Sequence, residues 1–208
     1  PVIAQELSKY YGDHLVFKEA GFTIQRGEKV AFVGRNGEGK STLVKCIMGE
    51  ITDYTGKLTL GHNVQIGYFA QNQASLLDEE LTVFQTVDDV TPSELKSNTK
   101  NLLGAFMFSG DDIDKKVKVL SGGERTRLAM IKLLLQPVNL LILDEPTNHL
   151  DIESIQWLED FLINNGKAVI VISHDRKFVD NITTRTIEVT MGRIYDYLSL
   201  IHISEPTR

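Results

Sequence analysis

Short apolar runs alternate with amphipathic stretches along most of the chain. Three runs, at residues 30–33, 140–143 and 168–172, are continuous, with no polar residue among the apolar ones. Strands that are buried on both faces show this pattern, and helices cover both faces of a parallel sheet. The pattern therefore predicts an α/β fold built on a mostly parallel sheet.

The stretches between these runs carry helical spacing or turn signals. We expect one helix at residues 40–48, directly after a glycine-rich turn, and another at 125–136, where Pro137 stops it. Residues 76–109 combine helical spacing with turn breakers and predict a small helical subdomain, which the second helix extends to about residue 135.

Near the N-terminus the pattern of apolar and polar residues is different. Residues 57–60 and 64–69 alternate between apolar and polar positions on either side of a turn at 61–63, which predicts two antiparallel strands joined as a hairpin. We therefore expect an N-terminal antiparallel β subdomain beside the parallel core.

The ends of the chain bear on its domain organisation. We expect residues 1–197 to form a single domain, and no initial Met precedes them, so we expect the chain to be part of a longer protein. Residues 198–208 lack continuity with the preceding pattern and resemble translated sequencing-adapter read-through. We expect a non-native or unstructured tail there, with a C-terminal strand as the alternative.

Composition narrows the classes of function. The 208 residues carry a net charge of −6, which argues against a broad nucleic-acid-binding face but leaves a local basic patch open. No apolar run approaches the ~20 residues that cross a bilayer. The single cysteine, Cys46, cannot form an internal disulfide, and we expect a buried side chain in a reducing compartment, the cytoplasm.

A phosphate-binding motif lies between the first continuous run and the first helix. It has the form G-x-x-x-x-G-K-[ST] and comprises Gly34, Arg35, Asn36, Gly37, Glu38, Gly39, Lys40, Ser41 and Thr42. Glycines let backbone N–H groups turn toward phosphate oxygens, and the following helix directs its positive end at the anion. Lys40 supplies a charge for the β- and γ-phosphates and Ser41 a hydroxyl for Mg²⁺. The motif predicts a nucleoside triphosphate site in a P-loop NTPase core.

Two carboxylates, Asp144 and Glu145, follow the second continuous run directly. Carboxylates at the end of a buried strand are costly unless a cation is near them. We expect Asp144 to hold Mg²⁺ through water and Glu145 to polarise the attacking water. A solvated turn is the alternative for this segment alone.

A third motif precedes the helix at 125–136. Ser121, Gly122, Gly123 and Glu124 match a capping box, in which Ser and Glu satisfy the first amides of a helix. The same free amides and glycines also form an anion site. The local sequence leaves both interpretations open.

Taken together, the order of these motifs resembles the ATP-binding cassette (ABC) family over nearly the whole chain. The resemblance implies ATP and Mg²⁺ as ligands, catalytic roles for Glu145, His174 and Gln71, and metal contacts from Ser41, Gln71 and Asp144. It implies that Tyr11, or alternatively Tyr10, stacks on adenine. It also implies that residues 121–124 contact the nucleotide of an opposite cassette.

The run from residue 145 to 151 is similar to that of the ABC-F subfamily, whose members carry two cassettes in one chain and act at the ribosome near the tRNA sites. The resemblance implies a cassette interface at Asn148, His149 and Asp151, although an N-terminal helix cap explains them as well. Only about 50 residues separate Gln71 from Ser121, too few for a long arm insertion, so we expect a second cassette. The alternatives are the ATPase subunit of a membrane transporter and a DNA-repair or chromosome-maintenance ATPase.

Overall fold

Two β-sheets organise the chain in the computed structural model, which describes residues 1–70, 72–148, 150–164 and 166–197. The larger sheet contains, in spatial order, β5 (Ile66–Phe69), β6 (Leu140–Asp144), β7 (Ala168–Ile172), β3 (Lys29–Val33), β8 (Arg185–Thr190) and β9 (Arg193–Tyr197). Its neighbouring strands are parallel except for β8 and β9. The smaller sheet is antiparallel, in the order β2 (His14–Ile24), β1 (Val2–Tyr11) and β4 (Thr55–Leu60).

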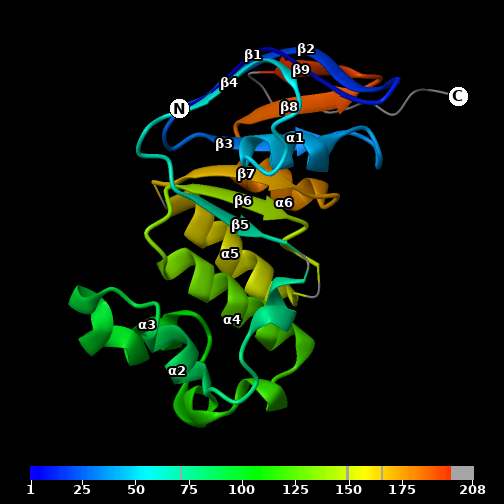
Figure 1. Cartoon of the computed structure of the whole chain (residues 1–208). Coiled ribbons are helices and arrows are strands. Elements are labelled where there is room, and N and C mark those ends of the chain that lie inside the picture. Colours follow the sequence, from blue (N-terminus) through cyan, green and yellow to red (C-terminus); the bar gives the residue numbers. More distant parts are fainter. Residues whose placement is uncertain (71, 149, 165, 198–208) are drawn as a thin grey trace, which may run out of the picture.

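Helices separate and cover these sheets (Figure 1). Helix α1 (Lys40–Ile47) lies between the two sheets, and α4 (Gly122–Leu135), α5 (Ile152–Asn164) and α6 (Arg176–Ile182) lie on the other side of the larger sheet. Helices α2 (Val83–Asp88) and α3 (Thr99–Ala105) lie farther out, at the lower left of the figure beside α4. Short 3₁₀ helices flank them along the chain: η1 (Gln73–Leu76) precedes α2, η2 (Ser93–Asn98) lies between α2 and α3, and η3 (Gly110–Asp114) and η4 (Val117–Val119) lie between α3 and α4.

The continuous apolar runs are strands buried on both faces, as predicted. In β6, Leu140 and Ile142 pack with α1 and the antiparallel sheet, whereas Leu141 and Leu143 pack with the helices on the opposite side. Full burial of each such side chain contributes about 1.5–3 kcal/mol. Because both faces are covered, no position of the strand tolerates a polar side chain cheaply, which explains the absence of alternation.

The predicted hairpin at residues 57–69 is wrong. Strand β4 pairs with β1 in the antiparallel sheet, whereas β5 pairs in parallel with β6 in the larger sheet. The N-terminal antiparallel subdomain exists, but its strands come from residues 2–24 and 55–60. Contacts between distant segments decide which strands pair. The residues of β5 alternate between buried and partly exposed positions because β5 is an edge strand, and the buried Gly67 lies against Leu133 and Val138.

Helix α1 carries the cysteine, and its environment leads to a testable prediction. The Cys46 side chain is 1% exposed, and burial raises the pKa of its thiol to about 11. A thiol with this pKa has about a hundredfold less thiolate at neutral pH than one at the ordinary value of 9.0. We therefore expect Cys46 to react with iodoacetamide at least about a hundredfold more slowly in the folded protein than in denaturant, measured by mass spectrometry. Similar rates in both states would contradict its buried position.

Within the described part of the chain, no helix combines the length and the apolar character that crossing a membrane requires. The expectation of a tail at residues 198–208 falls outside the residues that the structure describes.

Candidate functional site

The phosphate-binding motif forms a loop between β3 and α1. Two of its glycines are required by close approaches of the backbone. Gly34 has φ 146°, and a Cβ there would lie 2.2 Å from the carbonyl oxygen of Val189; Gly39 has φ 104°, and a Cβ there would lie 2.5 Å from a methyl carbon of Val16. Any other residue would strain the backbone and clash. The loop is thus held closely against β2 and β8.

Lys40, the first residue of α1, is buried and directed back into this loop. Its Nζ donates to the carbonyl oxygens of Gly34 at 2.7 Å and Arg35 at 3.0 Å. Burial lowers the pKa of Lys40, and the nearby carboxylates of Glu145 and Asp144 partly offset this effect. A desolvated cation beside an arc of backbone amides is suited to an anionic ligand.

The acidic pair lies at the carboxyl end of β6. Asp144 accepts a hydrogen bond at 3.2 Å from the hydroxyl of Tyr68 on β5. Burial, followed by the charge of Asp144, raises the pKa of Tyr68 to about 12, so its hydroxyl remains a donor at neutral pH. The backbone of Glu145 adopts φ 49°, and its N–H donates to the carbonyl of Ile172 at 2.7 Å. This turn directs Glu145 toward the end of β7.

His174 follows β7 and joins the acidic pair to the phosphate loop. Its Nε2 lies 3.1 Å from Oδ1 of Asn36 and 3.4 Å from Oε1 of Glu145. Its backbone N–H and the hydroxyl of Ser173 both donate to Oε2 of Glu145, at 3.3 and 3.4 Å. The Glu145 side chain is only 13% exposed, and these three contacts orient its carboxylate.

These segments surround one cavity of about 860 Å³. Its lining includes these predicted site residues: Tyr11, Asn36, Gly37, Gly39, Lys40, Ser41, Thr42, Asp144, Glu145, Asn148 and His174. Tyr11 lines the cavity and is half-exposed, whereas Tyr10 lines a separate hollow on the other face of the same strand. The structure therefore brings Tyr11, and not Tyr10, to the site.

Other predicted residues lie elsewhere. Gly34, Arg35 and Glu38 belong to the loop but do not line the cavity, and Glu38 instead accepts a hydrogen bond at 2.7 Å from the N–H of Met191. Gln71 and His149 lie outside the residues that the structure describes.

The Ser121–Glu124 motif lies at the start of α4, away from the cavity. Ser121 and Glu124 form the predicted capping box, with bonds of 2.7 and 3.3 Å between backbone N–H groups and side-chain oxygens. Ser121 and Gly122 are exposed. The capping role is therefore present, and the exposed end of the helix remains accessible to another molecule.

Asp151 is also a cap, and it belongs to a contact between α4 and α5. Its Oδ1 accepts from the N–H of Ser154 at 2.7 Å. The hydroxyl of Ser154 accepts at 3.1 Å from the buried guanidinium of Arg127 on α4, which lies over the ring of Phe108. Asp151 is thus linked through Ser154 to the helix that carries the exposed motif.

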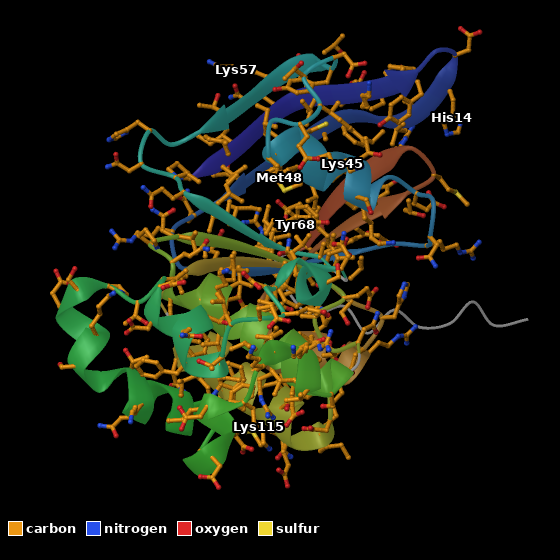
Figure 2. All side chains as sticks on the ribbon, turned by 60° about the horizontal axis from the view of Figure 1, so that its bottom comes forward. His14, Lys45, Met48, Lys57, Tyr68 and Lys115 are labelled. Atoms are coloured by element: carbon orange, nitrogen blue, oxygen red, sulfur yellow. The ribbon has the colours of Figure 1, made fainter. Side chains whose placement is uncertain are left out.

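The sequence interpretation missed five residues that line the cavity: His14, Val16, Ala70, Asn72 and Ile172. His14 pairs with Tyr11 across the turn between β1 and β2, and Figure 2 shows it at the tip of that hairpin. Gly12 and Asp13, which follow Tyr11, are typical turn residues, and a turn at this position would have predicted that His14 lies opposite Tyr11. Tyr68, which Figure 2 shows near the centre of the molecule, had no local signal, because its partner is 76 residues away.

The donor set of the cavity fits Mg²⁺. The Ser41 hydroxyl and the Asp144 carboxylate line the same space, next to the phosphate loop. Mg²⁺ prefers a few oxygen ligands and keeps several waters, so it is usually bound by one or two protein groups together with phosphates.

A phosphate loop between the parallel strand β3 and helix α1, with an acidic pair at the end of β6, which β7 separates from β3 in the sheet, defines the class of P-loop nucleotide-binding proteins. The sequence profile of the family described as "ABC transporter" matches residues 17–148. The chain belongs to this family and is an ABC ATPase domain that binds ATP.

Curated relatives point to one branch of the family. The chain is 47% identical over 188 residues to ABC transporter F family member 5 of Arabidopsis thaliana, covering 90% of this chain and 27% of that protein. It is 44% identical to the putative ATP-binding protein YdiF of Bacillus subtilis, with coverage of 86% and 28%. It is 40% identical to the probable ATP-binding protein YbiT of Escherichia coli O157:H7, with coverage of 92% and 36%. The chain is thus related to ABC-F proteins and spans about a third of their length.

A solved structure described as an ATP binding subunit of an ABC transporter has the same fold. The TM-score is 0.79 at 22% identity, over 96% of this chain and 90% of the other. This likeness confirms the α/β architecture with its two sheets.

Proposed function

We propose that this chain binds Mg·ATP in the cavity described above and hydrolyses it as one half of a paired ABC-F cassette. The observation that carries the proposal is the convergence of three segments on a single cavity: the phosphate loop, the acidic pair and His174. The Ser121–Glu124 motif lies apart and exposed at the start of α4. The chain therefore presents a nucleotide cavity and, elsewhere, an anion-binding helix end for a second one.

Each group in the cavity has a role that its position supports. Tyr11 stacks on adenine, the amides of residues 34–42 and Lys40 hold the phosphates, and Ser41 and Asp144 would hold Mg²⁺. For Gln71, which lies outside the described residues, the role as a further metal ligand rests on the resemblance to the ABC family alone. Glu145 polarises the attacking water, and His174 contacts the γ-phosphate. Mg²⁺, when bound, neutralises the charge that develops on the phosphate oxygens. Positioned charges of this kind supply most of the catalysis in phosphoryl transfer.

The exposed position of the Ser121–Glu124 motif supports a partner cassette. We take residues 1–197 as one cassette whose Ser121, Gly122, Gly123 and Glu124 face the nucleotide of the partner. Asn148 lines the cavity and Asp151 caps α5, which agrees with their proposed place at the interface of the two cassettes; the same role for His149 rests on the ABC-F resemblance alone. The relatives are far longer than this chain, which agrees with a second cassette in the same protein.

The ABC-F relationship supports a role in the cytoplasm, at the ribosome near the tRNA sites. We expect the full-length protein carrying Glu145→Gln to co-sediment with ribosomes in the presence of ATP, because this change retains the closed, ATP-bound pair. Association should fall at least about tenfold when ADP replaces ATP. The control is the same protein with Lys40→Ala added, which should not associate. Absence of ATP-dependent association would contradict the ribosomal role while leaving the ATPase assignment intact.

The alternative, a nucleotide-binding subunit of a membrane transporter, agrees with the fold of the solved structure. The DNA sequence upstream of Pro1 discriminates between the two. A second cassette in the same reading frame supports the ABC-F assignment, whereas an adjacent gene for a membrane protein supports the transporter.

A further inference from the structure

Lys9 on strand β1 is a fully buried lysine that the proposed mechanism does not use. Its side chain is 0% exposed. It belongs to the antiparallel sheet, whose residue Tyr11 lines the nucleotide cavity. Its Nζ donates to Oδ2 of Asp53 at 2.6 Å and to the backbone carbonyl of Asp53 at 3.0 Å. A buried ammonium is costly unless it is paired. These two bonds satisfy two of its three N–H donors.

The remaining side of this ammonium faces an aromatic ring of the site. Nζ of Lys9 lies 4.4 Å from the centroid of the Tyr11 ring, within the range of a cation–π contact. The two residues are separated by one position on β1 and therefore lie on the same face of the strand. One face of the ring is occupied by Lys9, while the ring remains 50% exposed and lines the cavity.

Asp53 anchors this contact to the segment that follows α1. It follows α1, whose first residue is Lys40, and it is itself 80% exposed. The hydrogen bond from Lys9 lowers the pKa of the Asp53 carboxyl, so this carboxylate stays ionised at neutral pH. Lys9 thus joins the strand that presents Tyr11 to the segment after the helix that begins at the phosphate loop.

We propose that Lys9, anchored by Asp53, is a positioning residue for base recognition: it holds the Tyr11 ring from behind, so that the free face is presented to the base of the nucleotide. The inference rests on the proposed stacking of adenine on Tyr11. A ring held in one rotamer loses less entropy when the base binds, and the contact therefore strengthens base binding without touching the nucleotide.

The test compares a ligand with a base and one without. In Lys9→Met, the dissociation constant for Mg·ATP should rise about fivefold to tenfold, less than the full loss of a desolvated cation–π contact would give, because only the orientation of the ring acts on the base. The dissociation constant for inorganic tripolyphosphate with Mg²⁺ should stay within about twofold, because its phosphate contacts remain. Isothermal titration calorimetry measures both. Lys18→Met is the matched control, since Lys18 is exposed on β2 of the same sheet and should change neither value.

A double-mutant cycle separates positioning from a structural role. Tyr11→Leu should weaken ATP binding about tenfold, and adding Lys9→Met to it should cause no further loss. Asp53→Ala, at an exposed position, serves as a second variant and should weaken ATP binding while sparing tripolyphosphate. Equal weakening of both ligands by Lys9→Met, or unchanged ATP binding in a folded Lys9→Met protein, would overturn the inference. Unchanged ATP binding in Tyr11→Leu would instead overturn the proposed stacking on which it rests.

Discussion

Replacement of Lys40 by alanine is expected to raise the dissociation constant for Mg·ATP about 10-fold to 100-fold. Lys40 is buried and directed into the phosphate loop, where its Nζ donates to two carbonyl oxygens that a triphosphate would replace as partners. Charge-assisted hydrogen bonds contribute about 1.5–3 kcal/mol each, and 1.4 kcal/mol corresponds to a factor of ten in affinity. Equilibrium titration with a fluorescent ATP analogue measures the change.

The control for this experiment is Lys45→Ala. Lys45 lies on the same helix, α1, but its side chain is exposed, and Figure 2 labels it on that helix. Its loss should leave the affinity unchanged. If Lys45→Ala weakened binding as much as Lys40→Ala, the effect would be one of net charge or helix stability, and the specific role of Lys40 would be lost.

Glu145→Gln is expected to leave ATP binding within about twofold of the unchanged protein and to lower turnover about 10²-fold to 10⁴-fold, the range that general-base catalysis supplies. The amide keeps the size of the side chain but cannot accept a proton from water. Turnover should be measured as phosphate release at high concentrations of the chain, where, under the proposed pairing, each copy offers its Ser121–Glu124 motif to the nucleotide of the other.

The rate of phosphate release by the unchanged protein should therefore rise more steeply than linearly with its concentration.

Glu94→Gln is a suitable control, because Glu94 is exposed on η2 and far from the acidic pair in sequence. It should retain full turnover. Hydrolysis that survives in a pure Glu145→Gln protein would assign the base to another group. A rate per molecule that does not depend on concentration would contradict the paired site.

The surroundings of Glu145 agree with the role of general base proposed for it. Its side chain is largely buried, yet it receives hydrogen bonds from the hydroxyl of Ser173 and the backbone of His174, both at the end of the neighbouring strand β7. A carboxylate oriented by neighbours does not have to reorganise when the reaction begins. The close pairing of β6 with β7 is therefore part of the site.

Local features of the chain were predictable from the sequence alone. The continuous runs at residues 30–33, 140–143 and 168–172 predicted buried parallel strands, because burial on both faces leaves no polar position in the strand. The phosphate loop was predictable because glycines at special φ angles, a lysine and a helix start form a motif of nine adjacent residues. The acidic pair was predictable because it follows a buried strand directly.

Other features depend on contacts between distant segments. The alternation at residues 64–69 did not reveal that β5 pairs with β6 instead of β4, since a strand pattern reports its exposed face and not its partner. The same holds for Lys9 and Asp53, which are 44 residues apart. Nothing near Lys9 in the sequence marks it as buried, because its burial comes from packing against the segment after α1.

The sequence by itself determined which chemistry this protein carries: a phosphate loop, an acidic pair and a capped, glycine-rich helix start, each built from neighbouring residues. Only the tertiary structure decided how they are grouped. It placed Tyr11 and not Tyr10 in the cavity, brought His174 to Glu145, and left Ser121 exposed elsewhere. The physical reason is that strand order and the burial of each face arise from packing over the whole chain, which no short motif encodes.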